Sequence, residues 1–286
     1  MAIRIGDFNE LRVTRNTEFG LRLEDQEGDG EDVLLPNAFV PAEGAAPGAV
    51  LRVFVYTDSE DRPVATTQEP FGIVGDVVPL EVVDVGNVGA FLDWGLDKDL
   101  LVPHREMSVP LEPGDEAVVL VRLDERTGRV VGTTRLEEHL SRAPSGFAPG
   151  QVVRALVAQR TPLGWTVALD AESLGFIYED QAPEELRIGD SADGWVQRVR
   201  PDGRVDVTLR PPAKVAVKED APEILRALDR AGGFLALHDG SPPEEIERAF
   251  GISKKAFKRA IAGLYRQQKI VIEATGIRRV KLPRKS

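Results

Sequence analysis

The sequence of 286 residues contains no cysteine, only three histidines and two methionines, and 6% aromatic residues. The absence of cysteine excludes disulfides, thiolate metal sites and cysteine nucleophiles. No stretch approaches the ~18 apolar residues of a membrane-spanning helix. The first residues, Met1 to Asp7, show neither the apolar run nor the cleavage site of a signal peptide. We therefore expect a cytoplasmic protein with no membrane association.

Signals for catalysis are also missing. The three histidines are far apart in the sequence and lack metal-ligand spacing. An acidic segment from Asp25 to Gly30 begins like a calcium loop, but Pro36 stands where the bidentate glutamate belongs. The aspartates between Asp93 and Asp99 lie in one connecting segment, and no glycine-rich phosphate loop is present. We predict a protein with no catalytic site, no metal and no cofactor.

Charge is distributed unevenly along the chain, although the net charge is −11. Residues 1–67 carry a net −7, residues 68–143 carry −8, residues 144–213 carry −3, and residues 214–286 carry +7. A basic end on an acidic chain indicates a polyanionic partner at that end.

Three stretches repeat one order of short strands. The strands predicted in the first repeat are 8–13, 19–23, 33–36 and 48–55; in the second, 80–85, 88–92, 100–103, 114–121 and 130–134; in the third, 152–157, 163–169, 174–177, 195–199 and 205–209. Five short strands in about 65 residues, with a glycine before the fourth, are typical of an OB-type barrel. Three unrelated small β domains are the alternative, which the recurring order of landmarks makes weaker.

The C-terminal segment has a helical period instead. We predict a helix over 221–231, a second helix capped by Ser241 and ending at Gly251, and a third from Ser253 to about Gln268. Two strands, 270–273 and 278–282, then close the chain, and three helices followed by a hairpin describe a winged helix. The predicted fold is mainly β and multidomain: three tandem five-stranded OB-type barrels at 1–67, 68–143 and 144–213, followed by an α+β winged-helix domain at 214–286.

Two pairs of segments resemble a known family. VDVGNVGAFL (83–92) with LVPHREM (101–107) resembles the S1 domain, an RNA-binding OB barrel. PPEEI (242–246) with FGISKKAFKRA (250–260) is the more specific pair. Together they resemble the bacterial conserved virulence factor B family over essentially the whole chain. The resemblance implies three S1-like barrels, a winged helix, and an RNA-binding regulator of bacterial gene expression, including virulence genes, that acts post-transcriptionally or with translation.

The stacking surface of S1 domains is reduced in every repeat. The family pattern has two aromatic residues three apart and a histidine on the next strand; the matching positions here are Phe19 and Arg22, Val88 and Phe91, Leu163 and Thr166, with Pro103 at the histidine position and His104 beside it. Stacking on an aromatic ring contributes about 1–3 kcal/mol per base, so fewer rings imply weaker or more selective binding. Phe19, Arg22 and Phe91 are candidates for RNA contact, with core or rim packing as the alternative for the two rings.

Basic residues supply the other candidates. The last hairpin of the third repeat carries Arg198, Arg200, Arg204 and Arg210 near Trp195, interrupted by Asp202 and Asp206. The third predicted helix of the tail carries Lys254, Lys255, Lys258 and Arg259, and the final hairpin carries Arg278, Arg279 and Lys281. Like charges four residues apart destabilise a helix, and a phosphate backbone along that face reverses the effect.

We therefore predict an RNA-binding protein that prefers single strands. One alternative is a protein-interaction adaptor whose acidic N-terminal barrels dock a basic protein, and another is a DNA-binding winged-helix regulator of transcription. OB barrels favour single strands, which weakens the second alternative.

Overall fold

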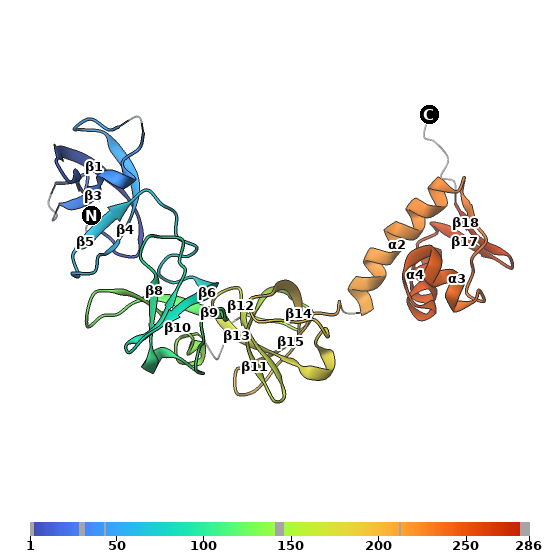
Figure 1. Cartoon of the computed structure of the whole chain (residues 1–286). Helices are drawn as coiled ribbons and strands as arrows, with labels where there is room; N and C mark the ends of the chain where they lie inside the picture. Colours follow the sequence, from blue (N-terminus) through green and yellow to red (C-terminus); the bar gives the residue numbers. More distant parts are fainter. Residues whose placement is uncertain (1–2, 29–31, 43, 141–145, 212, 281–286) are drawn as a thin grey trace. The chain divides into compact units, whose positions relative to one another are not determined.

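The computed structural model describes residues 3–28, 32–42, 44–140, 146–211 and 213–280 (Figure 1). The chain divides into two compact units, residues 1–209 and residues 210–286. The first unit holds three β barrels and the second holds a small helical domain with a three-stranded sheet. None of the helices in the described part of the chain is long and apolar enough to cross a membrane.

Barrel 1 is a closed five-stranded barrel with the strand order β1-β2-β3-β5-β4. The third and fifth strands close it in parallel, with Leu34 opposite Val64. Its strands are β1 (Asp7–Thr17), β2 (Gly20–Glu24), β3 (Val33–Pro36), β4 (Val50–Thr57) and β5 (Pro63–Thr66), with the 3-10 turn η1 (Asn37–Phe39) after β3.

Barrel 3 repeats this order as β11-β12-β13-β15-β14 and is also closed. Barrel 2 has the order β10-β9-β6-β7-β8: β8 and β10 lie side by side but are not joined by hydrogen bonds into a ladder, so this barrel is nearly closed. The strands are β6 (Val77–Val85), β7 (Gly89–Leu92), β8 (Leu100–Pro103), β9 (Glu116–Leu123), β10 (Val130–Thr133), β11 (Val152–Thr161), β12 (Gly164–Leu169), β13 (Ser173–Tyr178), β14 (Ser191–Val199) and β15 (Val205–Thr208). The turns η2 (His104–Glu106) and η3 (Glu179–Gln181) follow β8 and β13, and the short helix α1 (Leu136–His139) leaves barrel 2.

One backbone device recurs in all three barrels. The first strand has a bulge, at which the register shifts between Val82 and Asp84 in barrel 2 and at matching places in the other two. The glycine before the fourth strand donates its N–H to the carbonyl at the bulge; these pairs are Gly48 to Val13, Gly114 to Val82 and Gly189 to Val157. The prediction of three OB-type barrels is confirmed, and the shared bulge shows that they are copies of one plan.

A second recurring glycine opens the second strand. In barrel 2 it is Gly89, with φ of 156°, and a Cβ there would lie 2.1 Å from the carbonyl oxygen of Val102. Gly20 and Gly164 make the same close approach in the other barrels. Only glycine allows the strand to pass this close to its neighbour, so the residue just before it, at the end of the turn, is held at one place in each barrel.

The three barrels are joined by apolar contacts rather than separated by linkers. Phe54 of barrel 1 is fully buried in the core of barrel 2, where its ring meets Trp94 edge-on at 5.5 Å. Val77 and Leu136 of barrel 2 share another buried cluster with Leu174 of barrel 3. Burial of this kind fixes the barrels of the first unit to one another.

The second unit is a winged helix, as predicted (Figure 1). It contains α2 (Ala213–Arg230), β16 (Phe234–Leu235), α3 (Pro243–Phe250), α4 (Lys254–Arg266), β17 (Ile270–Glu273) and β18 (Gly276–Arg279). The core is lined by apolar residues of α2 and α4, including Ile224, Leu228, Phe257, Ile261 and Leu264.

Two local predictions in this unit were wrong. Helix α2 begins at Ala213, eight residues before the predicted start, because Pro222 is tolerated inside it rather than marking its first turn. Ser241 does not cap α3, which has Pro242 at its N-cap; the Ser241 hydroxyl instead accepts the backbone N–H of His238 at 3.0 Å. Ser253 does cap α4, since it accepts the N–H of Ala256 at 3.3 Å.

Candidate nucleic-acid interface

The second, third and fifth strands neighbour one another in each barrel. The resemblance to S1 domains implies that RNA binds the outward side of these strands, which we call the ligand face. At its edge, just before the recurring glycine, each barrel exposes a large apolar residue: Phe19 is 68% exposed, Val88 59% and Leu163 73%. The second aromatic position of the S1 pattern lies three residues further on, on the second strand. The residue there pairs with one on the third strand: Arg22 with Leu34, Phe91 with Leu101, and Thr166 with Phe176. The structure therefore places Phe19 just before the second strand of barrel 1, and Arg22 and Phe91 on the second strands of barrels 1 and 2; their contact with RNA stays a prediction.

Barrel 3 has Leu163 and Thr166 at the two S1 stacking positions, but its third strand carries two rings. Phe176 and Tyr178 are half-buried on β13 and meet edge-on, with their centroids 5.2 Å apart. They line a cleft of about 260 Å³ together with Leu163, Arg200 and Arg204. Sequence reasoning missed both rings, although the alternation of Phe176 and Tyr178 along one strand was a signal that they share a face.

A buried carboxylate holds the arginine of this cleft in place. Asp206 lies on β15, and its carboxylate accepts hydrogen bonds from Nε of Arg200 at 2.7 Å and from Nη2 of Arg198 at 2.7 Å. Arg200 also donates to the hydroxyl of Tyr178 at 2.8 Å, and its guanidinium carbon lies 5.7 Å from that ring's centroid. Burial alone raises the pKa of Asp206, but the hydrogen bonds from Arg200 and Arg198 outweigh it and lower the pKa. The cleft thus presents two aromatic rings beside a cation whose orientation is fixed.

The other predicted members of this patch are placed differently. Arg204 lines the cleft and lies 4.0 Å from Asp202, its nearest carboxylate. Trp195 lies on β14 between Val152 and Thr208, outside the lining of the cleft. Its indole Nε1 is buried and has no hydrogen-bond partner among the residues that the structure describes. The structure therefore brings Arg198, Arg200 and Arg204 together but does not bring Trp195 to them.

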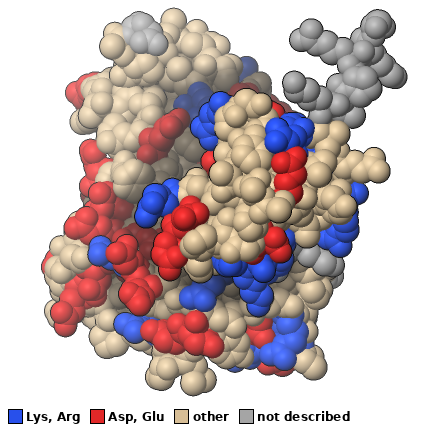
Figure 2. Space-filling model, turned by 90° about the vertical axis from the view of Figure 1, so that its right-hand side faces the viewer, with Lys and Arg blue, Asp and Glu red and all other residues tan. Residues whose placement is uncertain are grey.

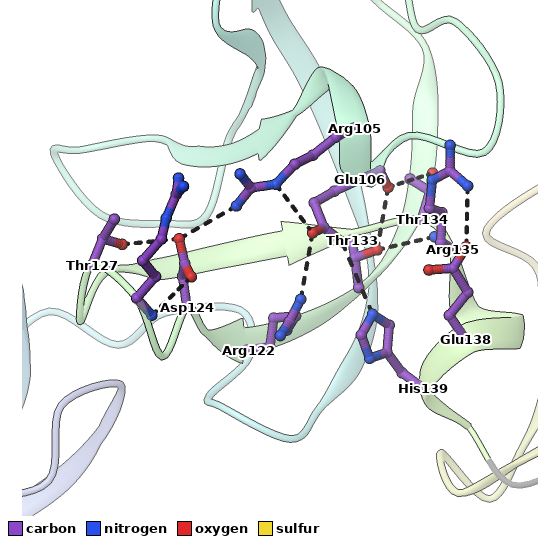
Figure 3. A network of polar contacts seen from close by, with 11 residues as sticks. Arg105, Glu106, Arg122, Asp124, Thr127, Thr133, Thr134, Arg135, Glu138 and His139 are labelled. Carbon is purple, nitrogen blue, oxygen red and sulfur yellow. Dashed lines mark hydrogen bonds and ion pairs between the residues drawn. The ribbon is translucent and has the colours of Figure 1, made fainter.

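Barrel 2 has much of its positive charge bound by its own carboxylates. Glu106, at the end of η2, lies 3.6 Å from Arg105 and 3.5 Å from Arg122 (Figure 3). The imidazole of His139 lies 3.9 Å from the same carboxylate, and Arg105 also contacts Asp124 at 3.5 Å. A phosphate approaching these arginines has to compete with side chains that already hold them.

The exposed face of α4 has cations with no such competitor. Lys255, Lys258 and Arg259 are exposed, and none has an ion pair or hydrogen bond within the part of the chain that the structure describes. Lys254 is half-buried and donates to the backbone carbonyl of Gly240 at 3.2 Å.

Two residues that sequence reasoning missed extend this face. Tyr265 and Arg266 stand seven residues after Lys258 and Arg259 and therefore lie on the same side of the helix. The Tyr265 side chain is 54% exposed. The i, i+7 spacing in the sequence was sufficient to place both residues there.

The hairpin of the winged helix is less available. Arg278 forms an ion pair with Glu273 and lies over the ring of Phe234, 4.7 Å from its centroid. Arg279 bonds Asp229 at 3.1 Å. Lys281, the third predicted residue, lies outside the described residues. On the face shown in Figure 2, several acidic side chains lie next to basic ones, and other residues cover much of the rest.

Comparison with known proteins agrees with this architecture. Residues 5–68 match the S1 domain family, and residues 222–278 match the family described as the CvfB-like winged helix domain. The chain is 30% identical over 280 residues to the uncharacterized protein YitL of Bacillus subtilis (strain 168), covering 95% of this chain and 92% of that protein. It is 27% identical over 228 residues to conserved virulence factor B of Staphylococcus aureus (strain N315), covering 77% and 76%. A solved multidomain protein with nucleic acid binding domains from Streptococcus pneumoniae is 25% identical, covers 96% of this chain and 98% of that chain, and has a TM-score of 0.43.

Tandem S1-type barrels with a C-terminal winged helix define a class of multidomain protein built from nucleic-acid-binding domains. Within that class, the chain belongs to the conserved virulence factor B family.

Proposed function

We propose that this protein binds single-stranded RNA in the cytoplasm and regulates bacterial gene expression, virulence genes included, after transcription or together with translation. The observation that carries the proposal is the cleft of barrel 3, in which Phe176 and Tyr178 stand beside Arg200. Unstacked bases are the ligands that such a surface fits, because every base has a π face and an edge for hydrogen bonds.

The cleft of barrel 3 and the exposed face of α4 make different contacts with RNA. In the cleft, a base stacks on one of the two half-buried rings, Phe176 or Tyr178, while Arg204 attracts the neighbouring phosphate. On α4, the cations Lys255, Lys258 and Arg259 neutralise phosphates without regard to sequence. The net charge of +7 on residues 214–286 favours this end of the chain for a polyanion.

The proposed role is binding without catalysis. The S1 and winged-helix families are nucleic-acid-binding domains rather than enzymes. The residues that the structure describes contain no group of three or more His, Asp or Glu side chains arranged to hold a metal. Residues 29–30, at the end of the acidic segment that begins at Asp25, lie outside the described residues.

A titration of the full chain with single-stranded RNA, duplex DNA and single-stranded DNA over a range of salt concentrations tests the proposal. We expect RNA to bind with the highest affinity, with a salt dependence that reports phosphate contacts, and to be recovered intact with or without divalent metal. Tighter binding to duplex DNA supports the transcription regulator instead. No binding to any nucleic acid contradicts the proposal and leaves the adaptor, docked to a basic protein through the acidic barrels.

A further inference from the structure

One arginine recurs at the same place in all three barrels, directly before the fifth strand. These residues are Arg62 before β5, Arg129 before β10 and Arg204 before β15. The fifth strand lies beside the third in every barrel, so each arginine stands at the edge of a ligand face. Arg129 and Arg204 both line the cleft of their barrel.

The partners of this arginine differ from barrel to barrel. Arg204 lies 4.0 Å from Asp202. Arg62 is held within its own loop by Asp58 at 2.8 Å and Glu60 at 2.9 Å. Arg129 is held by a residue of another barrel, since the loop before β5 of barrel 1 directs Asp61 onto it.

The pair between Asp61 and Arg129 has the geometry of a bound phosphate. Nη2 of Arg129 donates to Oδ2 of Asp61 at 2.6 Å while Nε donates to Oδ1, so two oxygens meet the guanidinium fork. Carboxylate and phosphate are the two groups that match this fork. The hydrogen bonds from Arg129 lower the pKa of Asp61.

The same loop also binds Lys98, the other cation of the barrel 2 cleft. Lys98 Nζ donates to the carbonyl oxygens of Thr57 at 2.7 Å and Asp58 at 2.9 Å. The cleft has a volume of about 440 Å³ and is also lined by Val88, Phe91 and Leu101, with Ser59 of the loop at its edge. The remaining lining residues are the valines Val130 and Val131 and the carboxylates Asp97 and Asp99. Barrel 2 thus has an apolar shelf with two cations and two carboxylates in one cleft, and barrel 1 supplies oxygen atoms that contact both cations.

We propose that the cleft of barrel 2 is a second site for single-stranded RNA, in which Asp61 of barrel 1 occupies the phosphate position on Arg129 until a phosphate displaces it. The inference rests on the proposed function, because it assumes that RNA reaches the ligand faces. It extends that function by adding a site that barrel 1 competes for. Phe54 and Trp94 keep the two barrels attached when the ion pair opens.

The variant Asp61→Asn in the full chain tests the proposal. Asn keeps the size of the side chain and tolerates the left-handed backbone at this position, where φ is 65°. We expect single-stranded RNA to bind up to about fivefold more tightly, the effect of one exposed charge pair, and the salt slope to steepen by about 0.7 for one added phosphate contact. Asp61→Gly also fits the backbone and should give the same result if the carboxylate is the competitor.

Glu60→Gln is the matched control, because it removes one negative charge from the same loop but takes a carboxylate from Arg62, which Asp58 still holds, and leaves the pair between Asp61 and Arg129 intact. It should change RNA affinity less than Asp61→Asn, and adding Arg129→Gln to Asp61→Asn should abolish the gain. The variants are first shown to be folded by their thermal unfolding curves. The proposal is overturned if wild type binds RNA but Asp61→Asn and Asp61→Gly leave both the affinity and the salt slope unchanged. It is also overturned if Glu60→Gln gives an equal gain or if the gain survives the loss of Arg129. A chain that binds RNA in neither form contradicts the proposed function as well.

Discussion

Replacing Phe176 by leucine separates stacking from packing in the barrel 3 cleft. The matching positions in barrels 1 and 2 are Leu34 and Leu101, so the fold accepts leucine there. The substitution removes a π face but keeps an apolar side chain. Loss of one stacked base weakens binding by about 1–3 kcal/mol, which is about 5- to 150-fold in Kd. Fluorescence anisotropy with a labelled single-stranded RNA of about 12 nucleotides, within the site size of one or two OB folds, measures this directly.

Phe19→Leu is the matched control in barrel 1. The Phe19 ring is more exposed than Phe176, but its neighbour Arg22 lies 3.4 Å from Asp32 and its barrel is acidic. We expect a change of less than about twofold for Phe19→Leu, because the RNA is held elsewhere. Equal affinities for Phe176→Leu and wild type, or an equal loss in both variants, would refute the assignment of stacking to barrel 3.

Three further outcomes follow from particular interactions. Changing Lys254, Lys255, Lys258 and Arg259 together to alanine should reduce the salt slope by about 0.7 for each phosphate that the helix no longer neutralises, with thermal unfolding little changed; an unchanged slope contradicts the α4 assignment. The ionised Asp206 should stabilise the fold above its unfolded pKa of 3.8, and this stabilisation should be lost as the pH falls through its lower folded pKa. The free energies of unfolding of wild type and Asp206→Asn, measured in urea, should therefore converge between about pH 5 and pH 2. Gly89→Ala should destabilise barrel 2 by about 2–3 kcal/mol or more. The loss should be larger than for Gly114→Ala, because a Cβ at Gly114 would meet no atom within 4 Å. Equal losses would show that the positive φ, rather than the close approach to Val102, sets the cost of the substitution.

The repeated fold was predictable because each barrel's landmarks are local in sequence. The alternation of apolar residues predicted the strands. A glycine opens each second strand because the backbone passes too close for a Cβ, as at Gly89, and another precedes each fourth strand, where it bonds the bulge, as at Val82. Helix α4 was predictable for the same reason, since its cap at Ser253 and its apolar stripe lie within one segment. The start of α2 was not, because a helix tolerates Pro222 only when its surroundings support it.

The binding surface was less predictable because it depends on contacts between strands and between barrels. The family pattern directed attention to the second strand, while barrel 3 carries its rings on the third, at Phe176 and Tyr178. Charge counts did not distinguish Arg204, which lines an open cleft, from Arg129, which meets a carboxylate 68 residues away in sequence. Long-range ion pairs of this kind have no sequence signature.

The central claim is that barrel 3 and α4 supply most of the RNA affinity, with the acidic barrels contributing less. Photocrosslinking of the full chain to single-stranded RNA containing 4-thiouridine, followed by mass spectrometry of the crosslinked peptides, tests it most directly. The account predicts crosslinks at Phe176 or Tyr178 in barrel 3 and at Tyr265 on α4. Crosslinks confined to residues 1–143 would contradict it.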